Sequence, residues 1–368
     1  MTITYAADVV PVTLRPYLTS FVNTCWCIGQ LIASGVLKGC LGLDGNWGWR
    51  IPYAVQWIWP LPVFIITLFA PESPWWLVRH NRLDEARDSL IKLAWYSPSS
   101  SAESIAVDQT IAMMIYTNKL EQEHEADTSY LDCFRGVSLR RTEITCVTWL
   151  VQNTCGAAML GWAVYFMEQA GLEASSAFSL GVGQSAIAFV GNVTAWFILP
   201  HVGRRALYLG GQIAMLATLL LIGGFGTPKL YEGSPWAWAT GGVLIFQFFI
   251  YAVSVGPACY ALVGEIPSTR LRIKTVVLAR SVYQMAGIVI GILMPKFMNP
   301  DEWNWRGKAA FFWAGTCALG IVWTYFRLPE PNRLTFAELD VLFAERVSAR
   351  KFNKARVEAF KVEKVTEL

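Results

Sequence analysis

Histidine and charge are both scarce in this chain. The three histidines, His80, His124 and His201, lie far apart and lack the spacing of metal ligands, so no metal site is predicted. Charged residues make up 15% of the 368 residues, against about 25% in an ordinary soluble protein. A net charge of +3 is too small to indicate a nucleic-acid partner. Most of the eight cysteines lie in apolar runs and are interpreted as small buried hydrophobes, and no cofactor is implied.

Apolar residues take the place of the missing charge and make up 54% of the sequence. They gather in runs of about 20 residues, the length that a helix needs to cross a bilayer. The chain is therefore predicted to be an all-α, polytopic membrane protein. The eight predicted spans lie at about residues 16–37, 50–69, 143–167, 177–200, 206–226, 237–263, 275–297 and 308–327.

Polar segments between and after these spans divide the chain into four predicted parts. The N-terminal spans are followed by a helical linker, a C-terminal group of six spans and a charged tail. Lysine and arginine concentrate in the linker, in two turns and in the tail, so these segments and both termini are predicted to be cytoplasmic. The predicted location of the protein is the plasma membrane. The four parts are residues 1–70, 71–142, 143–328 and 329–368.

Short motifs occur twice in this sequence and in the same order. Such duplicated halves in a polytopic membrane protein indicate a secondary transporter. The pairs, each separated by 256 to 258 residues, are Asp8 and Arg15 with Glu265 and Arg272, Trp47–Arg50 with Trp303–Arg306, and Pro71–Glu72 with Pro329–Glu330.

The two copies differ in what precedes them. About 120 residues of predicted spans precede Glu265, whereas seven residues precede Asp8. We therefore expect a parent of twelve spans, of which this chain lacks the first three and most of the fourth. Transport by this chain alone is expected to be impaired, because alternating access needs two halves around a central site.

Several of these motifs resemble the sugar porters of the major facilitator superfamily. Pro71–Leu77 resembles that family's signature after its sixth helix, and Gly203–Arg205 resembles the turn between its eighth and ninth helices. Gly256–Glu265 resembles the end of the tenth helix, and Pro329–Glu330 the signature after the twelfth. The resemblance implies the major facilitator fold, with about eight full transmembrane helices in this chain.

Within that family the chain is most similar to the fungal α-glucoside (maltose) permease group, through Gln152–Gly171, Pro267–Arg272 and Glu338–Phe343. The group implies a transporter that moves an α-glucoside disaccharide such as maltose, with protons, across a lipid bilayer by alternating access. The family's proton acceptor lies on the first helix, which is absent here. A hexose or polyol facilitator and a non-transporting remnant or sensor stay as alternatives. An enzyme is not predicted, because no intramembrane cluster of acids, histidines or nucleophiles is found.

Charged residues near the predicted cytoplasmic ends of the spans form the first candidate site. The resemblance implies that they make an ion-pair network, a gate that closes the inner mouth when the carrier faces outward. The alternative is that they reflect topology alone. The candidate gate residues are Asp8, Arg15 and Glu72 in the first half, and Arg204, Arg205, Glu265, Arg272 and Glu330 in the second.

Amides and aromatic side chains inside the spans form the second candidate site. A sugar needs hydrogen-bonding side chains in a mostly apolar cleft and ring faces for its C–H surfaces. The alternative for the amides is hydrogen bonding between helices. The candidate substrate-binding residues are Asn23, Gln30, Gln152, Asn153, Tyr260, Tyr283 and Gln284.

Overall fold

The structure is a computed structural model, and its described part is helical and contains no β-strand. The chain divides into two compact units. The first unit comprises Met1–Trp26 and Gly39–Thr128, and the second comprises Cys27–Lys38 and Ser129–Leu368. The described residues are 15–43, 45–94, 107–116, 118–119, 129–169, 171–226, 235–268, 271–331 and 336–352.

The first unit holds both ends of a long helix, shorter helices with the bounds given below, and a helical stretch at 107–116. Pro60 lies in the first turn of α4, where a helix does not need the backbone N–H that proline lacks. A small apolar core forms farther along the unit from Leu77, Val78, Ala86 and Met114. The helices are α2 (Arg15–Cys40), α3 (Trp47–Val55), α4 (Pro60–Phe69), α5 (Pro74–Arg79) and α6 (Leu83–Ala94), with a 3-10 turn at Gln56–Ile58 between α3 and α4.

The apolar segment Trp47–Phe69 of this unit buries none of its most hydropathic residues within the protein. Trp57 is 80% exposed and Phe69 is 83% exposed. Large apolar side chains at such exposure suit contact with lipid rather than water.

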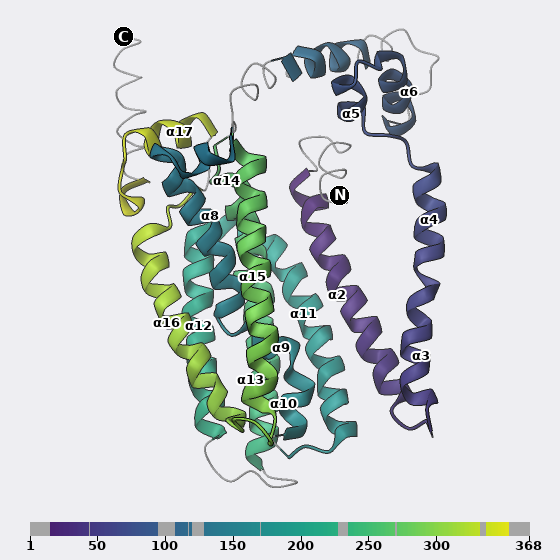
Figure 1. Ribbon diagram of the computed structural model, residues 1–368, viewed down its shortest axis with the longest axis vertical. Coiled ribbons are helices and arrows are strands. Elements are labelled where there is room, and N and C mark those ends of the chain that lie inside the picture. Colours follow the sequence, from purple (N-terminus) through teal and green to yellow (C-terminus); the bar gives the residue numbers. More distant parts are fainter. Residues whose placement is uncertain are drawn as a thin grey trace. The chain divides into compact units, whose positions relative to one another are not determined.

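The second unit is a bundle of long helices around one large core. Helix α11 packs on α13, α12 on both α13 and α16, and α15 on α8 (Figure 1). Tyr208, Met215, Phe297 and Trp313 are among the largest fully buried side chains of the core. The helices are α8 (Gly136–Thr154), α9 (Ala157–Gly161), α10 (Ala163–Gln169), α11 (Ala174–Val202), α12 (Arg204–Phe225), α13 (Pro235–Val253), α14 (Val255–Glu265), α15 (Arg272–Met298), α16 (Ala309–Arg327) and α17 (Phe336–Ala344). Short 3-10 turns lie at Tyr130–Phe134, Arg306–Lys308 and Ala349–Lys351.

Among the described residues, six helical segments are long and apolar enough to cross a membrane. The predicted span at 16–37 lies within α2, and the one at 143–167 is divided among α8, α9 and α10. The four-part division made from the sequence stays a prediction. The six segments are Trp47–Phe69, Ala174–Ile198, Arg204–Phe225, Pro235–Glu265, Arg272–Met298 and Arg306–Arg327.

The predicted span at 143–167 is interrupted at Gly156, between α8 and α9. Its φ of +98° lies in the left-handed region, which ends α8 and starts α9 in a new direction. A Cβ on Gly156 would lie 2.9 Å from Nε2 of Gln247 and 2.9 Å from each δ carbon of Leu219. Both the backbone conformation and the packing therefore require glycine at this break.

Replacing Gly156 with alanine is expected to lower the stability of the second unit by about 1–3 kcal/mol, because the new methyl group strains φ and presses on Gln247 and Leu219. The measurement is thermal unfolding of the purified chain in detergent micelles. Gly161→Ala is the matched control, since a Cβ there meets no atom within 4 Å. Equal melting temperatures for the two variants would contradict the requirement.

Candidate functional site

Three helices of the second unit bring together aromatic rings, amides and one guanidinium, which we call the aromatic–amide cluster. Helix α8 packs against both α14 and α15, and all three helices contribute to the group. The cluster consists of Trp149, Gln152 and Asn153 on α8, Tyr260 on α14, and Arg280 and Tyr283 on α15.

Ring contacts hold the aromatic part of the cluster. The Trp149 and Tyr260 rings meet edge to face, with centroids 6.3 Å apart and planes at 79°. The centroids of Trp149 and Tyr283 are 5.9 Å apart at 54°. Nδ2 of Asn153 donates to the backbone carbonyl oxygen of Tyr283 at 3.0 Å. This hydrogen bond connects α8 to α15 through the amide nitrogen of Asn153 and does not use Oδ1.

Within this cluster, Gln152 has a buried amide oxygen without a partner. The side chain is only 3% exposed, and Oε1 has no hydrogen-bond partner among the described residues. Leaving a buried acceptor unpaired costs on the order of 1–3 kcal/mol. A hydroxyl group that donates to this oxygen would recover that cost, so the position suits a polyhydroxylated ligand.

Arg280 is the member of the cluster that the sequence reasoning missed. Its guanidinium carbon lies 5.1 Å from the centroid of the Trp149 ring and 4.6 Å from that of Tyr283. The same group interacts with the hydroxyl of Tyr260. Such stacking is the cation–π interaction, which strengthens when the cation is partly desolvated. A cation well inside the predicted span 275–297 was the available signal. Trp149 carried no signal, because tryptophan is common in this sequence.

The other predicted substrate-binding residues lie apart from the cluster or outside the described residues. Gln30 is exposed on α2, and Gln284 is exposed on α15 beside Tyr283. The side chain of Asn23 is outside the described residues. For these three positions the sugar-binding role stays a prediction.

Four of the candidate gate residues meet at one end of the second unit, and we call them the charged cluster: Arg204, Arg205, Glu265 and Glu330. Nη2 of Arg204 lies 3.1 Å from Oε1 of Glu265, with the two side chains 21% and 29% exposed. The carboxylate of Glu330 accepts from the backbone N–H of Arg204 and that of Arg205, each at 3.0 Å. One carboxylate therefore caps the start of α12, where helical N–H groups have no partner within the helix.

Gly203 makes this cap possible. Its φ is +86°, and a Cβ there would lie 2.8 Å from Oε2 of Glu330. Arg205 continues the connection, because its Nη2 donates to the Tyr325 carbonyl oxygen on α16 at 2.8 Å. The cluster thereby joins the start of α12 to the end of α14 and to the segment that follows α16.

The remaining candidate gate residues are Asp8, Arg15, Glu72 and Arg272. Asp8 and the side chain of Arg15 are outside the described residues. Glu72 is exposed in the first unit, where its backbone carbonyl accepts from Oγ of Ser89 at 2.5 Å. Arg272 is half-buried at the start of α15. The gating role of all eight residues stays a prediction.

Replacing Glu330 with glutamine is expected to lower the free energy of unfolding by about 1.5–3 kcal/mol, because the neutral amide offers one acceptor where the carboxylate offers two charged ones. Thermal unfolding of the purified variant measures the change. Glu345→Gln is the control, since Glu345 is exposed and carries the same charge. A loss of stability no larger than that of the control would show that the cap contributes nothing.

Comparisons with known proteins agree with this architecture. The family described as sugar (and other) transporter matches residues 1–343. A general alpha-glucoside permease of Saccharomyces cerevisiae is 39% identical over 363 residues, which is 98% of this chain and 58% of the permease. The maltose permease MAL31 of the same species is 36% identical, with the same coverage. The chain therefore spans less than two thirds of the length of these relatives.

Solved structures show the same fold at lower sequence identity. The proton:xylose symporter XylE of the major facilitator superfamily, bound to 6-bromo-6-deoxy-D-glucose, is 20% identical with a TM-score of 0.72, over 93% of this chain and 70% of that one. The inward-open form of the xylose transporter XylE from E. coli has a TM-score of 0.70, over 93% of this chain and 68% of that one. The predicted all-α, multi-pass major facilitator fold is confirmed.

Proposed function

Because this chain belongs to the sugar (and other) transporter family, we propose that it serves the transport of an α-glucoside disaccharide such as maltose across a membrane. The observation that carries the proposal is the unpaired Oε1 of Gln152, a buried amide about one helical turn from Trp149 on α8. The names of the two yeast relatives supply the substrate class. A sugar is the ligand whose chemistry matches both parts of the aromatic–amide cluster.

Each part of that cluster has a role in this proposal. A sugar hydroxyl donates to Oε1 of Gln152, and the guanidinium of Arg280 donates to another hydroxyl oxygen. The C–H surface of a glucose ring packs on Tyr260, which is 42% exposed and presents the largest open ring face of the group. Trp149 and Tyr283 hold Arg280 in place through their rings.

Alternating access would follow from the placement of both clusters on the same helices. Helix α14 carries Tyr260 and, five residues later, Glu265 of the charged cluster. Helix α15 begins at Arg272 and carries Arg280 and Tyr283. Ion pairs that form in one state and separate in the other bias the equilibrium between the two states. Sugar contacts that shift α14 would therefore act on the pair of Arg204 with Glu265.

Proton coupling and orientation complete the proposal. Symport is supported by the resemblance and by one structural neighbour that is a proton:xylose symporter. We infer that the protein lies in the plasma membrane with both termini in the cytoplasm, and the orientation is supported by the arginines where α12 and α15 begin and α16 ends. This assignment puts the charged cluster at the cytoplasmic end of the second unit.

Maltose is expected to bind the purified chain in detergent micelles, and Gln152→Ala should weaken the binding about tenfold, because one buried hydrogen bond contributes about 1.4 kcal/mol. Isothermal titration calorimetry measures both affinities. Gln169→Ala, on α10 and outside the cluster, should bind as the unaltered chain does. No maltose binding, or equal affinities for the two variants, would contradict the site. Tighter binding of glucose or sorbitol than of maltose would favour a hexose or polyol carrier.

A cysteine placed at Gln109 is expected to be protected from a membrane-impermeant maleimide in intact cells, because the linker is assigned to the cytoplasm. Gln109 is exposed within a helical stretch of the first unit. Asp301→Cys, in the exposed loop after α15, is the matched position on the other side and should be labelled. Labelling at 109 with protection at 301 would reverse the orientation.

A further inference from the structure

A basic pocket lies at the end of the second unit where α8 begins and α16 ends, beneath the segment that follows α17. Its volume is about 320 Å³, at the lower end of the roughly 300–1,000 Å³ typical of small-molecule sites. Arg140, Arg327 and Arg346 line it, together with Phe343 and Ser348. None of the described residues that line it is acidic. Neither the aromatic–amide cluster nor the charged cluster includes any of these residues.

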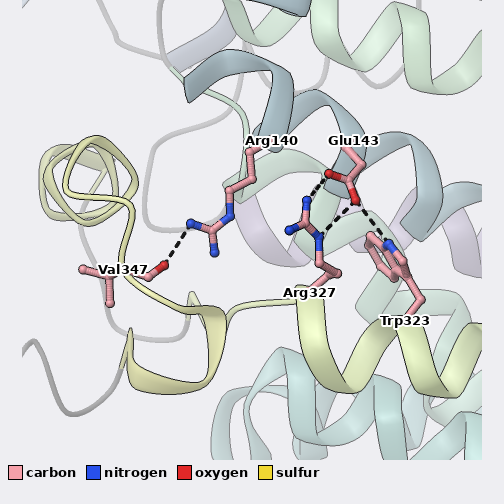
Figure 2. Close-up of polar contacts among 5 residues, drawn as sticks. All are labelled: Arg140, Glu143, Trp323, Arg327 and Val347. Carbon is pink, nitrogen blue, oxygen red and sulfur yellow. Dashed lines mark hydrogen bonds and ion pairs between the residues drawn. The ribbon is translucent and has the colours of Figure 1, made fainter. Parts of the chain in front are cut away.

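One of the three arginines is held in place by a carboxylate next to the pocket. Figure 2 shows Arg327 directed at Glu143, with two contacts between guanidinium and carboxylate, of which the one from Nε measures 3.1 Å. Nε1 of Trp323 also donates to Oε1 of Glu143, at 3.3 Å. Glu143 therefore offsets the charge of Arg327 and fixes the orientation of its side chain.

Among the residues that the structure describes, no carboxylate is bonded to Arg140. Its Nη1 donates to the backbone carbonyl oxygen of Val347 at 2.8 Å, and its guanidinium lies 5.4 Å from the centroid of the Phe343 ring (Figure 2). Burial and the positive charge of Arg327 both lower the pKa of the Arg140 guanidinium from its ordinary value. The charged form of Arg140 thus lies close to a second cation, an arrangement that a bound anion would relieve.

The charge of the pocket and its level relative to the bilayer indicate the class of ligand. Three arginines and Glu143 give the group a formal charge of +2. A phosphate monoester carries about −1.5 to −2 charges near neutral pH and offers three acceptor oxygens, which suit the planar donor face of a guanidinium. Arg327 is the last residue of the apolar segment Arg306–Arg327, so the pocket lies at the level of the headgroups of a bilayer.

We propose that this pocket binds a phosphate monoester. Arg140 and Arg346 donate to its oxygens, and Arg327 supplies the third positive charge. Because Arg346 belongs to the segment after α17 while Arg140 and Arg327 belong to α8 and α16, the bound phosphate ties that segment to the bundle. The ligand comes either from the headgroup of a phospholipid or from a soluble phosphate compound, which share this chemistry.

The test uses the full purified chain in phosphatidylcholine nanodiscs, with thermal unfolding and direct titration as readouts. Phosphatidic acid in the disc supplies the phosphate monoester as a lipid, and glycerol phosphate in solution supplies the same headgroup without acyl chains. One of the two probes is expected to raise the melting temperature and to saturate. Stabilisation by phosphatidic acid alone assigns a lipid site, and stabilisation by glycerol phosphate assigns a soluble ligand.

Arginine variants separate the pocket from general attraction to negative charge. Arg346→Gln should weaken binding of the effective probe at least about tenfold, and it should fold normally because Arg346 is exposed. Arg140→Gln should have the same effect. Arg135→Gln is the matched control, since its side chain is 76% exposed and does not line the pocket. Binding of neither probe, or equal binding by Arg346→Gln and Arg135→Gln, overturns the proposal.

Discussion

A polar side chain inside an apolar helix bundle must find a hydrogen-bond partner, and this constraint shapes the second unit more than any other. Most buried polar groups meet it. The hydroxyl of Tyr208 donates to the Thr148 carbonyl oxygen at 2.7 Å, and Nε2 of Gln212 donates to Oγ1 of Thr324 at 3.0 Å. These bonds connect α12 with α8 and α16, so polar contacts inside the core hold these three helices together.

Three glutamines have amide oxygens that do not meet the constraint among the described residues. Gln184 lies on α11, whereas Gln152 and Gln247 lie close to one break in the bundle. Oε1 of Gln152 and both polar atoms of Gln247 lack partners among the described residues. Gln152 precedes Gly156 by one helical turn, and Nε2 of Gln247 lies against the place where a Cβ of Gly156 would be. The left-handed backbone of Gly156 and these two unpaired amides thus lie together where α8 ends and α9 begins, next to the aromatic–amide cluster. Unsatisfied groups persist in folded proteins where function uses them, which supports a ligand site here.

Apolar runs were sufficient to predict an all-α polytopic protein, and the motifs shared with the sugar porters supplied the major facilitator fold, whereas the sites could be predicted only in part. The duplicated motifs pointed to Glu265 and Glu330, and the family resemblance of Gly203–Arg205 pointed to Arg204. The structure brings these three residues together. The neighbours of Gln152 were harder to find. Helices that are apolar on every side show no amphipathic phase, so the sequence does not tell which face of α15 brings Arg280 to Trp149. The break at Gly156 and the basic pocket depend on packing between segments far apart in sequence, which no local pattern records.

The central proposal is that Gln152 and the rings of the aromatic–amide cluster hold a sugar. A structure of the chain determined with maltose bound tests it most directly. The account predicts a glucose unit on the open face of Tyr260, with a hydroxyl group at hydrogen-bonding distance from Oε1 of Gln152. Maltose bound elsewhere in the bundle, with Oε1 of Gln152 still unpaired, would contradict it.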